Sequence, residues 1–308
     1  MTVGVTWIRK AERGDELWFA SDSRLTGDGN VWDDCPKLFA LPRRDAAAAF
    51  SGSTAQAYPL LLQIANAIVG HHPAIDGTLE FTWLVEHLAE VVNSMLAGIE
   101  RDRGVHGAAD PRAFSSRSDV IVLGGFSRHT GGLVLRALRY DTATGRWKFT
   151  HARARNEIGP NKVYRVYGDN RAASRFHHLF EGLLADRGKV KTSKPFDFEP
   201  LEALWRFMEL PESVERPLPA GHRPETVGGS PQVMQIRPGG AATPFVVRWR
   251  RDKEIHDYLL GRRVLPNENL DLPLIERVDG GLKVRGRGQW DRIGGPDSDP
   301  SPSNVGNA

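Results

Sequence analysis

The sequence of 308 residues is nearly free of cysteine, with Cys35 as the single example. One cysteine cannot form an internal disulfide, which excludes a small disulfide-stabilised secreted fold. Long apolar runs are also missing: no stretch reaches the ~18 apolar residues of a membrane-spanning helix. The first residues lack the basic segment and apolar core of a signal peptide. We therefore expect no membrane association and a cytoplasmic location.

The sequence also lacks a large excess of positive or negative charge. The 41 Lys and Arg residues nearly balance the 38 Asp and Glu residues, and the formal net charge is only +3. Nucleic-acid binding usually requires a strong basic excess, so we expect no nucleic-acid partner. The basic segments 248–251 and 262–263 are interpreted as solvated positions around a strand.

Motifs for bound cofactors are absent too. The sequence has no zinc-ligand spacing, no P-loop and no dinucleotide-binding glycine motif. Two histidine pairs, at 71–72 and 177–178, have no carboxylates that converge on them. We therefore expect neither a metal nor an organic cofactor.

Alternation of apolar with small or polar residues over 2–7 is typical of a half-buried strand. Short apolar segments between Gly- and Asp-containing turns predict the other strands. These segments are 17–20, 46–50, 120–126, 133–140, 147–150, 162–167, 232–236 and 245–249.

Two helices are predicted between the early and middle strands. The first has an apolar face over 60–68, and Pro59 predicts a start near Tyr58. The second begins at Phe81, has the clearest apolar stripe in the sequence, and is expected to end before Gly104.

Two more helices are predicted after the middle strands. One is capped by Asp169 or Asn170 and closed by Gly188, and a shorter one covers 201–210. Strands and helices therefore follow one another in blocks. Such segregation favours an α+β layered sandwich over an alternating parallel α/β sheet.

The chain is predicted to form a single domain over 1–285, with an insertion around 187–225. Beyond about Gly286 the composition shifts to Gly, Pro, Ser, Asp and Asn. This shift predicts a disordered tail over 286–308.

The candidate nucleophile is Thr2. Initiator methionine is generally removed before a small residue such as threonine. Once freed, Thr2 carries its hydroxyl beside its own α-amine, whose ordinary pKa of ~8 suits a general base near neutral pH. This is the threonine variant of nucleophilic catalysis. Cys35 is an alternative nucleophile, although a buried structural role is commoner for a cysteine.

Four further residues of this region are candidates to support Thr2. A Lys37 ammonium near the hydroxyl lowers the hydroxyl pKa and disfavours protonation of the amine. Asp22 can neutralise Lys37 and fix its direction, and Arg24 shares the face of Asp22 and extends the network. Gly52 lies in a turn where a substrate carbonyl can approach the backbone N–H groups of an oxyanion hole.

Four segments, 2–5, 19–24, 36–39 and 50–57, together resemble a known family. Their residues and spacing are similar to the N-terminal half of proteasome β-type subunits and their simpler bacterial relatives. Those proteins are N-terminal-nucleophile (Ntn) hydrolases.

The resemblance implies Thr2 as the nucleophile, Lys37 and Asp22 as its activating pair, and the Gly52 amide as oxyanion donor. It also implies a four-layer αββα sandwich, cleavage of a peptide or protein substrate through an ester on Thr2, and assembly into a homo-oligomer. A partner unfoldase and the substrate specificity are left open.

The second half of the chain matches this family more loosely. Segment 227–229 is similar to the family's Ser-Gly-Gly strand, but Val227 replaces the serine and Pro224 replaces an acidic residue. Asp169 stands where the family has a small serine turn. Either Asp169 or Glu225 supplies the missing carboxylate, or activity is weak or absent.

Two other functions therefore stay open. One is a catalytically silent proteasome-like scaffold or binding subunit. The other keeps the fold and the nucleophile but hydrolyses a small-molecule amide.

Overall fold

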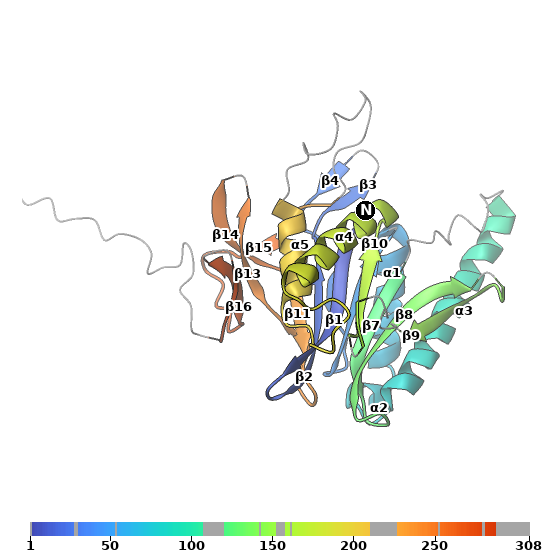
Figure 1. The fold of residues 1–308 in the computed structure, drawn as a ribbon. Coiled ribbons are helices and arrows are strands. Elements are labelled where there is room, and N and C mark those ends of the chain that lie inside the picture. Colours follow the sequence, from blue (N-terminus) through green and yellow to red (C-terminus); the bar gives the residue numbers. More distant parts are fainter. Residues whose placement is uncertain are drawn as a thin grey trace, which may run out of the picture.

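A computed structural model gives the arrangement of the chain (Figure 1). It describes residues 2–27, 30–52, 54–106, 120–141, 143–151, 158–160, 162–209, 227–251, 253–278 and 281–287. The predicted tail therefore lies almost wholly outside the described residues, and so does 210–226 of the predicted insertion.

Two five-stranded sheets form the centre of the protein. The first has the order β10-β1-β2-β11-β12 and the second the order β5-β6-β7-β8-β9, with every neighbouring pair antiparallel. The strands of the first sheet are β1 (Val3–Ala11), β2 (Gly14–Ser21), β10 (Tyr164–Gly168), β11 (Gln232–Ile236) and β12 (Thr243–Pro244). Those of the second are β5 (Leu38–Ala40), β6 (Ala46–Ser51), β7 (Val120–Ser127), β8 (Gly132–Asp141) and β9 (Arg146–His151).

Two smaller strand groups accompany the central sheets. Strands β3 (Leu25–Gly27) and β4 (Asn30–Trp32) form a hairpin between β2 and β5. A C-terminal sheet has the order β15-β14-β13-β16-β17, in which only β13 and β16 run parallel. Its strands are β13 (Val246–Arg251), β14 (Glu254–Leu259), β15 (Arg262–Arg263), β16 (Leu274–Val278) and β17 (Gly281–Arg285). In Figure 1 this sheet stands beside α5, away from α3.

The helices lie in two groups. They are α1 (Thr54–Val69), α2 (His72–Ile75), α3 (Phe81–His106), α4 (Asn170–Asp186) and α5 (Glu199–Glu209). Helices α1 and α3 cover the second sheet, whereas α4 and α5 cover the first (Figure 1). Among the described residues, no helix combines the length and apolar character needed to cross a bilayer.

Strand β6 shows how the layers pack. Ala46, Ala48 and Phe50 are buried against the apolar faces of α1 and α3. Ala47 and Ala49 are buried in a different cluster, which fills the space between the two central sheets. Successive strand side chains point to opposite faces, so a continuous apolar run is expected for a strand covered on both sides.

The other face of the first sheet has its own apolar cluster. Val3, Val5 and Trp7 of β1 pack there with Phe176 of α4 and Leu204 of α5. Each central sheet thus has helices on one face and the other sheet on its second face. The protein is a mixed α and β structure built on antiparallel sheets, which confirms the α+β prediction.

Two predicted helix boundaries were wrong. Helix α1 starts at Thr54 and contains Pro59, because burial of Ala57 in the cluster under α1 continues the packed face before the proline. Helix α3 runs to His106 and therefore passes Gly104. A glycine inside a helix costs only about 1 kcal/mol, which the rest of this long helix can offset.

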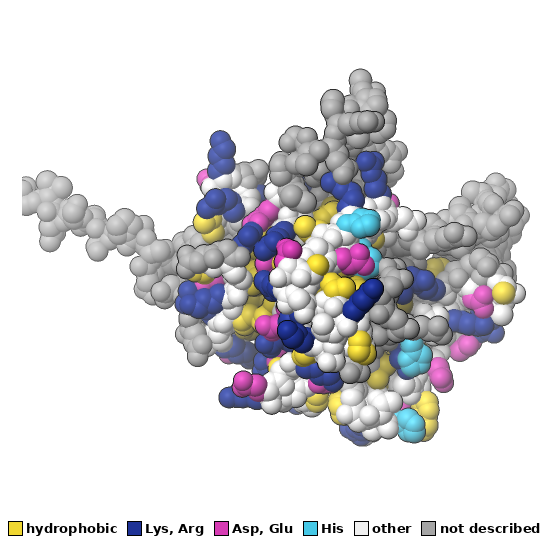
Figure 2. Space-filling view, in the orientation of Figure 1, with side chains coloured by type: hydrophobic (Ala, Val, Ile, Leu, Met, Phe, Trp, Pro, Cys, Tyr) yellow, Lys and Arg dark blue, Asp and Glu magenta, His cyan; other side chains and the backbone are white. Residues whose placement is uncertain are grey.

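Charged side chains of both signs are scattered over one face of the protein. On the face shown in Figure 2, Lys and Arg side chains are interspersed with Asp and Glu side chains. No single large patch of one sign appears on the part of that face that the structure describes.

Candidate active site

Thr2 lies immediately before β1, at the edge between the two central sheets. It is in phase with Gly4 and Thr6, which face the second sheet because Val3 and Val5 face α4 and α5. The ring of Tyr167 lies against Gly4 on this inner face, where a Cβ on Gly4 would come within 2.3 Å of the ring. Thr2 is only 2% exposed.

Asp22 and Lys37 form a fully buried ion pair beside the start of β1. Lys37 Nζ donates to Asp22 Oδ1 over 2.8 Å, and both side chains are 0% exposed. The same Oδ1 atom accepts a hydrogen bond from the Val3 N–H at 3.1 Å. One carboxylate oxygen therefore holds both the ammonium and the backbone amide that follows Thr2.

The backbone also ties Asp22 to this strand. The Asp22 N–H donates to the Val3 carbonyl at 3.2 Å, and the Ser21 hydroxyl donates to the same carbonyl at 3.3 Å. Asp22 Oδ2 accepts N–H groups from Arg24 and Gly228, each at 3.2 Å. The carboxylate is thus saturated by four donors, as a buried anion requires.

Burial dominates the electrostatics of Lys37. Removal of water lowers the pKa of its ammonium below the ordinary lysine value, and the attraction of Asp22 offsets this only in part. Arg24 contributes a smaller repulsion in the same direction as burial. A cation that holds its proton less tightly than a free lysine therefore sits next to the first strand.

Arg24 continues the network through a second acid. Its guanidinium makes a bidentate ion pair with Asp33, with Nε–Oδ1 at 2.6 Å and Nη2–Oδ2 at 3.1 Å. The guanidinium also lies against Gly228, where an added Cβ would approach within 2.5 Å of it. Arg24 is therefore joined to Asp22 by its backbone and to Asp33 by its side chain.

Gly52 follows β6 and precedes α1, as the sequence predicted. Its φ of +110° lies in the left-handed region that favours glycine. This conformation of Gly52 changes the direction of the backbone sharply between the end of β6 and the start of α1. The predicted role of its amide as an oxyanion donor stays a prediction.

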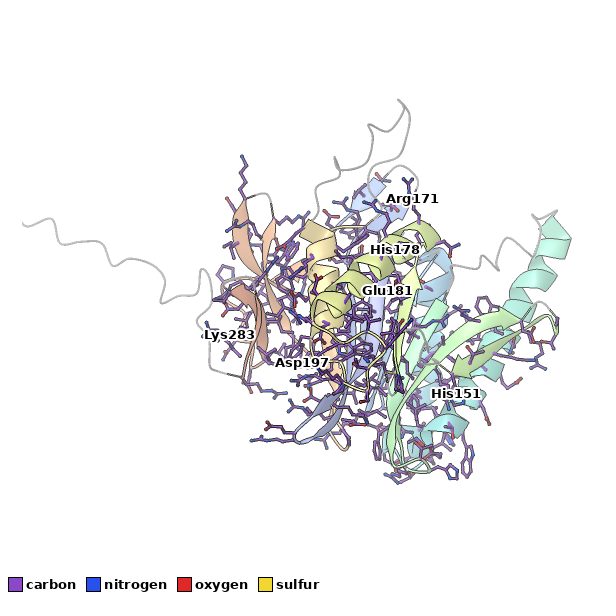
Figure 3. All side chains as sticks on the ribbon, viewed as in Figure 1. His151, Arg171, His178, Glu181, Asp197 and Lys283 are labelled. Atoms are coloured by element: carbon purple, nitrogen blue, oxygen red, sulfur yellow. The ribbon has the colours of Figure 1, made fainter. Side chains whose placement is uncertain are left out.

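Asp169 lies next to Thr2 but uses its carboxylate elsewhere. Its N–H donates to the Thr2 carbonyl at 2.9 Å. Its Oδ1 atom caps α4 by accepting the N–H groups of Arg171 and Ala172 at 3.0 and 3.2 Å. Arg171, labelled in Figure 3, marks this first turn of α4 at the end of the sheet where the chain begins, marked N in Figure 1.

The segment after 226 also reaches the site. Gly228 donates its N–H to Asp22 and accepts the N–H of Ser23 through its carbonyl at 3.1 Å. Val227 is partly buried against the cluster under α4 and α5. Pro224 and Glu225 lie outside the described residues.

Gln232 is a central residue that the sequence analysis missed. Its Oε1 accepts the N–H groups of Lys37 and Leu38 at 2.9 and 3.3 Å. Its Nε2 donates to the carbonyls of Cys35 and Asp22 at 2.6 and 3.3 Å. One amide thus holds the backbone on both sides of the ion pair. The only signal in the sequence is a polar residue at the start of a mostly apolar strand.

Cys35 and the described histidines are not gathered into a metal-binding cluster. Cys35 is buried and reduced, and burial raises the pKa of its thiol, which disfavours the reactive thiolate. Within the described parts of the chain, no cluster of His, Cys, Asp and Glu could hold a metal ion.

Comparisons with known proteins add no family. No protein-family model matches the chain, and no curated protein is found to match it.

Proposed function

We propose that the protein is a threonine-type Ntn hydrolase that cleaves peptide or other amide bonds in the cytoplasm. The central sheets with helices on their outer faces would then be the four-layer αββα sandwich of that family. The observation that carries the proposal is the Asp22 Oδ1 atom, which binds the Lys37 ammonium and the Val3 N–H together. It places a buried cation one residue from Thr2.

The proposed reaction begins after removal of Met1. The Thr2 hydroxyl oxygen attacks the substrate carbonyl carbon while its proton passes to the α-amine of the same residue. The amine then gives this proton to the leaving nitrogen as the amide C–N bond breaks, leaving an ester on Thr2. Water, deprotonated by the amine, cleaves the ester and returns the hydroxyl. Lys37 favours the anionic form of the hydroxyl, and the Gly52 amide stabilises the oxyanion.

Three observations favour a catalytically silent scaffold or binding subunit instead. Thr2 is almost fully buried, and Val227 stands where the family has a serine. In addition, the Asp169 carboxylate is engaged in capping α4. Hydrolysis of a small-molecule amide would use the same residues as peptide hydrolysis, and the homo-oligomer and partner unfoldase stay predictions.

Covalent labelling separates these functions. Intact-mass analysis should show loss of Met1, and a β-lactone probe should add one mass increment to the protein. Thr2→Ala should abolish labelling, and Lys37→Ala should slow it about 10²–10⁴-fold. Retained Met1 with no label contradicts the hydrolase. A label that persists in Thr2→Ala but disappears in Cys35→Ala assigns the reaction to the cysteine.

A further inference from the structure

The segment 33–37, which leads into β5 and ends at Lys37, is held by the C-terminal sheet. Arg251, the last residue of β13, donates from Nη2 to Asp33 Oδ2 at 2.9 Å. It also donates from Nη1 to Asp34 Oδ1 at 3.0 Å. One guanidinium thus joins two consecutive carboxylates more than two hundred residues away in sequence.

Asp33 is shared between two arginines. Arg24 and Arg251 both donate to its Oδ2 atom, at 3.1 and 2.9 Å. The Asp33 carbonyl accepts the Ser23 hydroxyl at 2.5 Å, and Ser23 Oγ in turn accepts the Ser230 N–H at 2.9 Å. Asp33 therefore contacts the C-terminal sheet and the segment after Asp22 directly, and it is linked through Ser23 to the segment that precedes β11.

The turn between β14 and β15 makes a second contact with the same segment. Leu260 and Gly261 both have positive φ, +48° and +95°, as a two-residue hairpin turn requires. Leu260 packs against the apolar cluster between the central sheets, and this burial offsets the strained backbone of a leucine there. A Cβ on Gly261 would lie 2.7 Å from Ser23 Cβ and 3.2 Å from the Cys35 carbonyl.

We propose that the C-terminal sheet is a clamp that fixes segment 33–37, with Arg251 as a positioning residue for Lys37. The ionic half of the clamp is Arg251 with Asp33 and Asp34, and the packed half is the Leu260–Gly261 turn. The consequence of the clamp for catalysis rests on the proposed function, whereas the effect of the clamp on segment 33–37 is independent of that function.

Cys35 provides a direct measurement of the clamp. It is the single cysteine, it lies inside segment 33–37, and it is only 4% exposed. A small aromatic disulfide reagent therefore reacts with the native protein only when this segment opens. Arg251→Met should speed that reaction about 10-fold or more, and Asp34→Asn should speed it less, since Asp34 is more exposed than Asp33.

Arg248→Met is the matched control. Arg248 lies on the same strand and makes a comparable bidentate ion pair, but with Asp257 inside the C-terminal sheet. Its loss should leave the Cys35 rate within about twofold of wild type. Equal acceleration in Arg248→Met and Arg251→Met, or no acceleration in Arg251→Met, overturns the clamp.

The packed half has its own variant. Gly261→Ala should also expose Cys35, because the added methyl meets Ser23. Gly14→Ala is its control: Gly14 has φ +113° in the hairpin between β1 and β2, but nothing lies within 4 Å of its added Cβ. If Gly14→Ala exposes Cys35 as much as Gly261→Ala does, backbone strain rather than contact is responsible and the packed half fails.

The effect on Lys37 is measured by NMR titration of labelled lysine side chains. In Arg251→Met the Lys37 pKa should rise toward the ordinary value, because water reaches the ammonium and two carboxylates lose their cation. Arg251→Lys should restore part of the wild-type value, and Arg248→Met should not change it. An unchanged Lys37 pKa in Arg251→Met overturns the positioning role.

The two proposals fail in different ways. If wild-type protein takes no label at Thr2 but Cys35 and Lys37 respond as expected, the hydrolase is wrong and the clamp stands. If Thr2 is labelled at the same rate in Arg251→Met as in wild type, with Cys35 still protected, the clamp is wrong and the hydrolase stands.

Discussion

Two ion pairs in this protein have the same nitrogen–oxygen distance, but the pKa values of their cations shift in opposite directions. Lys37–Asp22 at the front of the chain and Arg248–Asp257 in the C-terminal sheet both have a nitrogen–oxygen distance of 2.8 Å. Burial lowers the pKa of Lys37 despite its partner. For Arg248 burial also acts to lower the pKa, but hydrogen bonds and charges from Asp257 and Glu276 raise it above the ordinary value.

The difference lies in solvation. The Lys37 side chain is fully buried beside Asp22, whereas the Arg248 side chain is 20% exposed beside Asp257 and Glu276. A guanidinium is also less strongly hydrated than an ammonium, so less is lost on burial. Contact distance alone therefore does not predict the direction in which the pKa of a paired cation shifts.

The largest effect is expected from breaking the buried pair. Asp22→Asn or Lys37→Met alone should each lower the free energy of unfolding by about 3–5 kcal/mol, because the remaining charge stays buried after losing its opposite charge. The double variant should lose much less, since no charge is then left. Denaturant unfolding of the three variants measures this, and additive losses would show that the two charges are not coupled.

A smaller loss is expected in the C-terminal sheet. Arg248→Met should lower the free energy of unfolding by about 1.5–3 kcal/mol, because Asp257 and Glu276 lose charged hydrogen bonds but retain some access to water. Denaturant unfolding should place it clearly below the single variants of the buried pair. A loss as large as theirs would contradict the contrast in solvation.

The two pairs should also differ in their response to alkaline pH. The pKa of Lys37 in the folded protein lies below 10.5, the ordinary value that applies to the unfolded chain. At a pH between the folded pKa and 10.5, the unfolded chain binds more protons than the folded protein, so the free energy of unfolding rises with pH. The slope from one group is at most ~1.4 kcal/mol per pH unit. Unfolding titrations of the Asp22→Asn/Lys37→Met protein should lack this contribution, whereas Arg248→Met should keep it. A double variant with the wild-type slope would exclude Lys37 as its source.

The smallest effect is expected at the β3–β4 hairpin, which lies between Asp22 and Lys37 in the sequence. Trp32 is 67% exposed. Trp32→Ala should change the free energy of unfolding by no more than about 0.5 kcal/mol. Thermal unfolding tests this, and a larger loss would mean that the hairpin is covered in the folded protein.

The front of the site was predictable because its signals are local. Asp22 directly follows β2 and Lys37 directly precedes β5, and a carboxylate and an ammonium placed next to buried strands are expected to pair. Gly52 was predictable as the turn that ends a strand. Asp169 was one of two predicted caps of α4, and the structure confirms it. The near-complete burial of Thr2, in contrast, was outside what a linear pattern reveals.

The residues that hold segment 33–37 from other parts of the chain could not be predicted, and the reason is physical. Gln232 and Arg251 reach segment 33–37 from 195 and 218 positions away, and such contacts have no periodicity in sequence. The C-terminal sheet was missed beyond its first strand. In β14 charged and apolar residues mix without strict alternation, and its first residues are exposed.

The most direct test of the central claim is the chemistry of an epoxyketone adduct mapped by peptide mass spectrometry. If Thr2 supplies both the nucleophile and the base, the epoxyketone should react with both groups. The adduct should then be a ring that includes the hydroxyl oxygen and the α-amine nitrogen of Thr2. The peptide should begin at Thr2 and no longer react with amine reagents. An adduct on any other residue, or a Thr2 peptide that still carries Met1, would contradict the account.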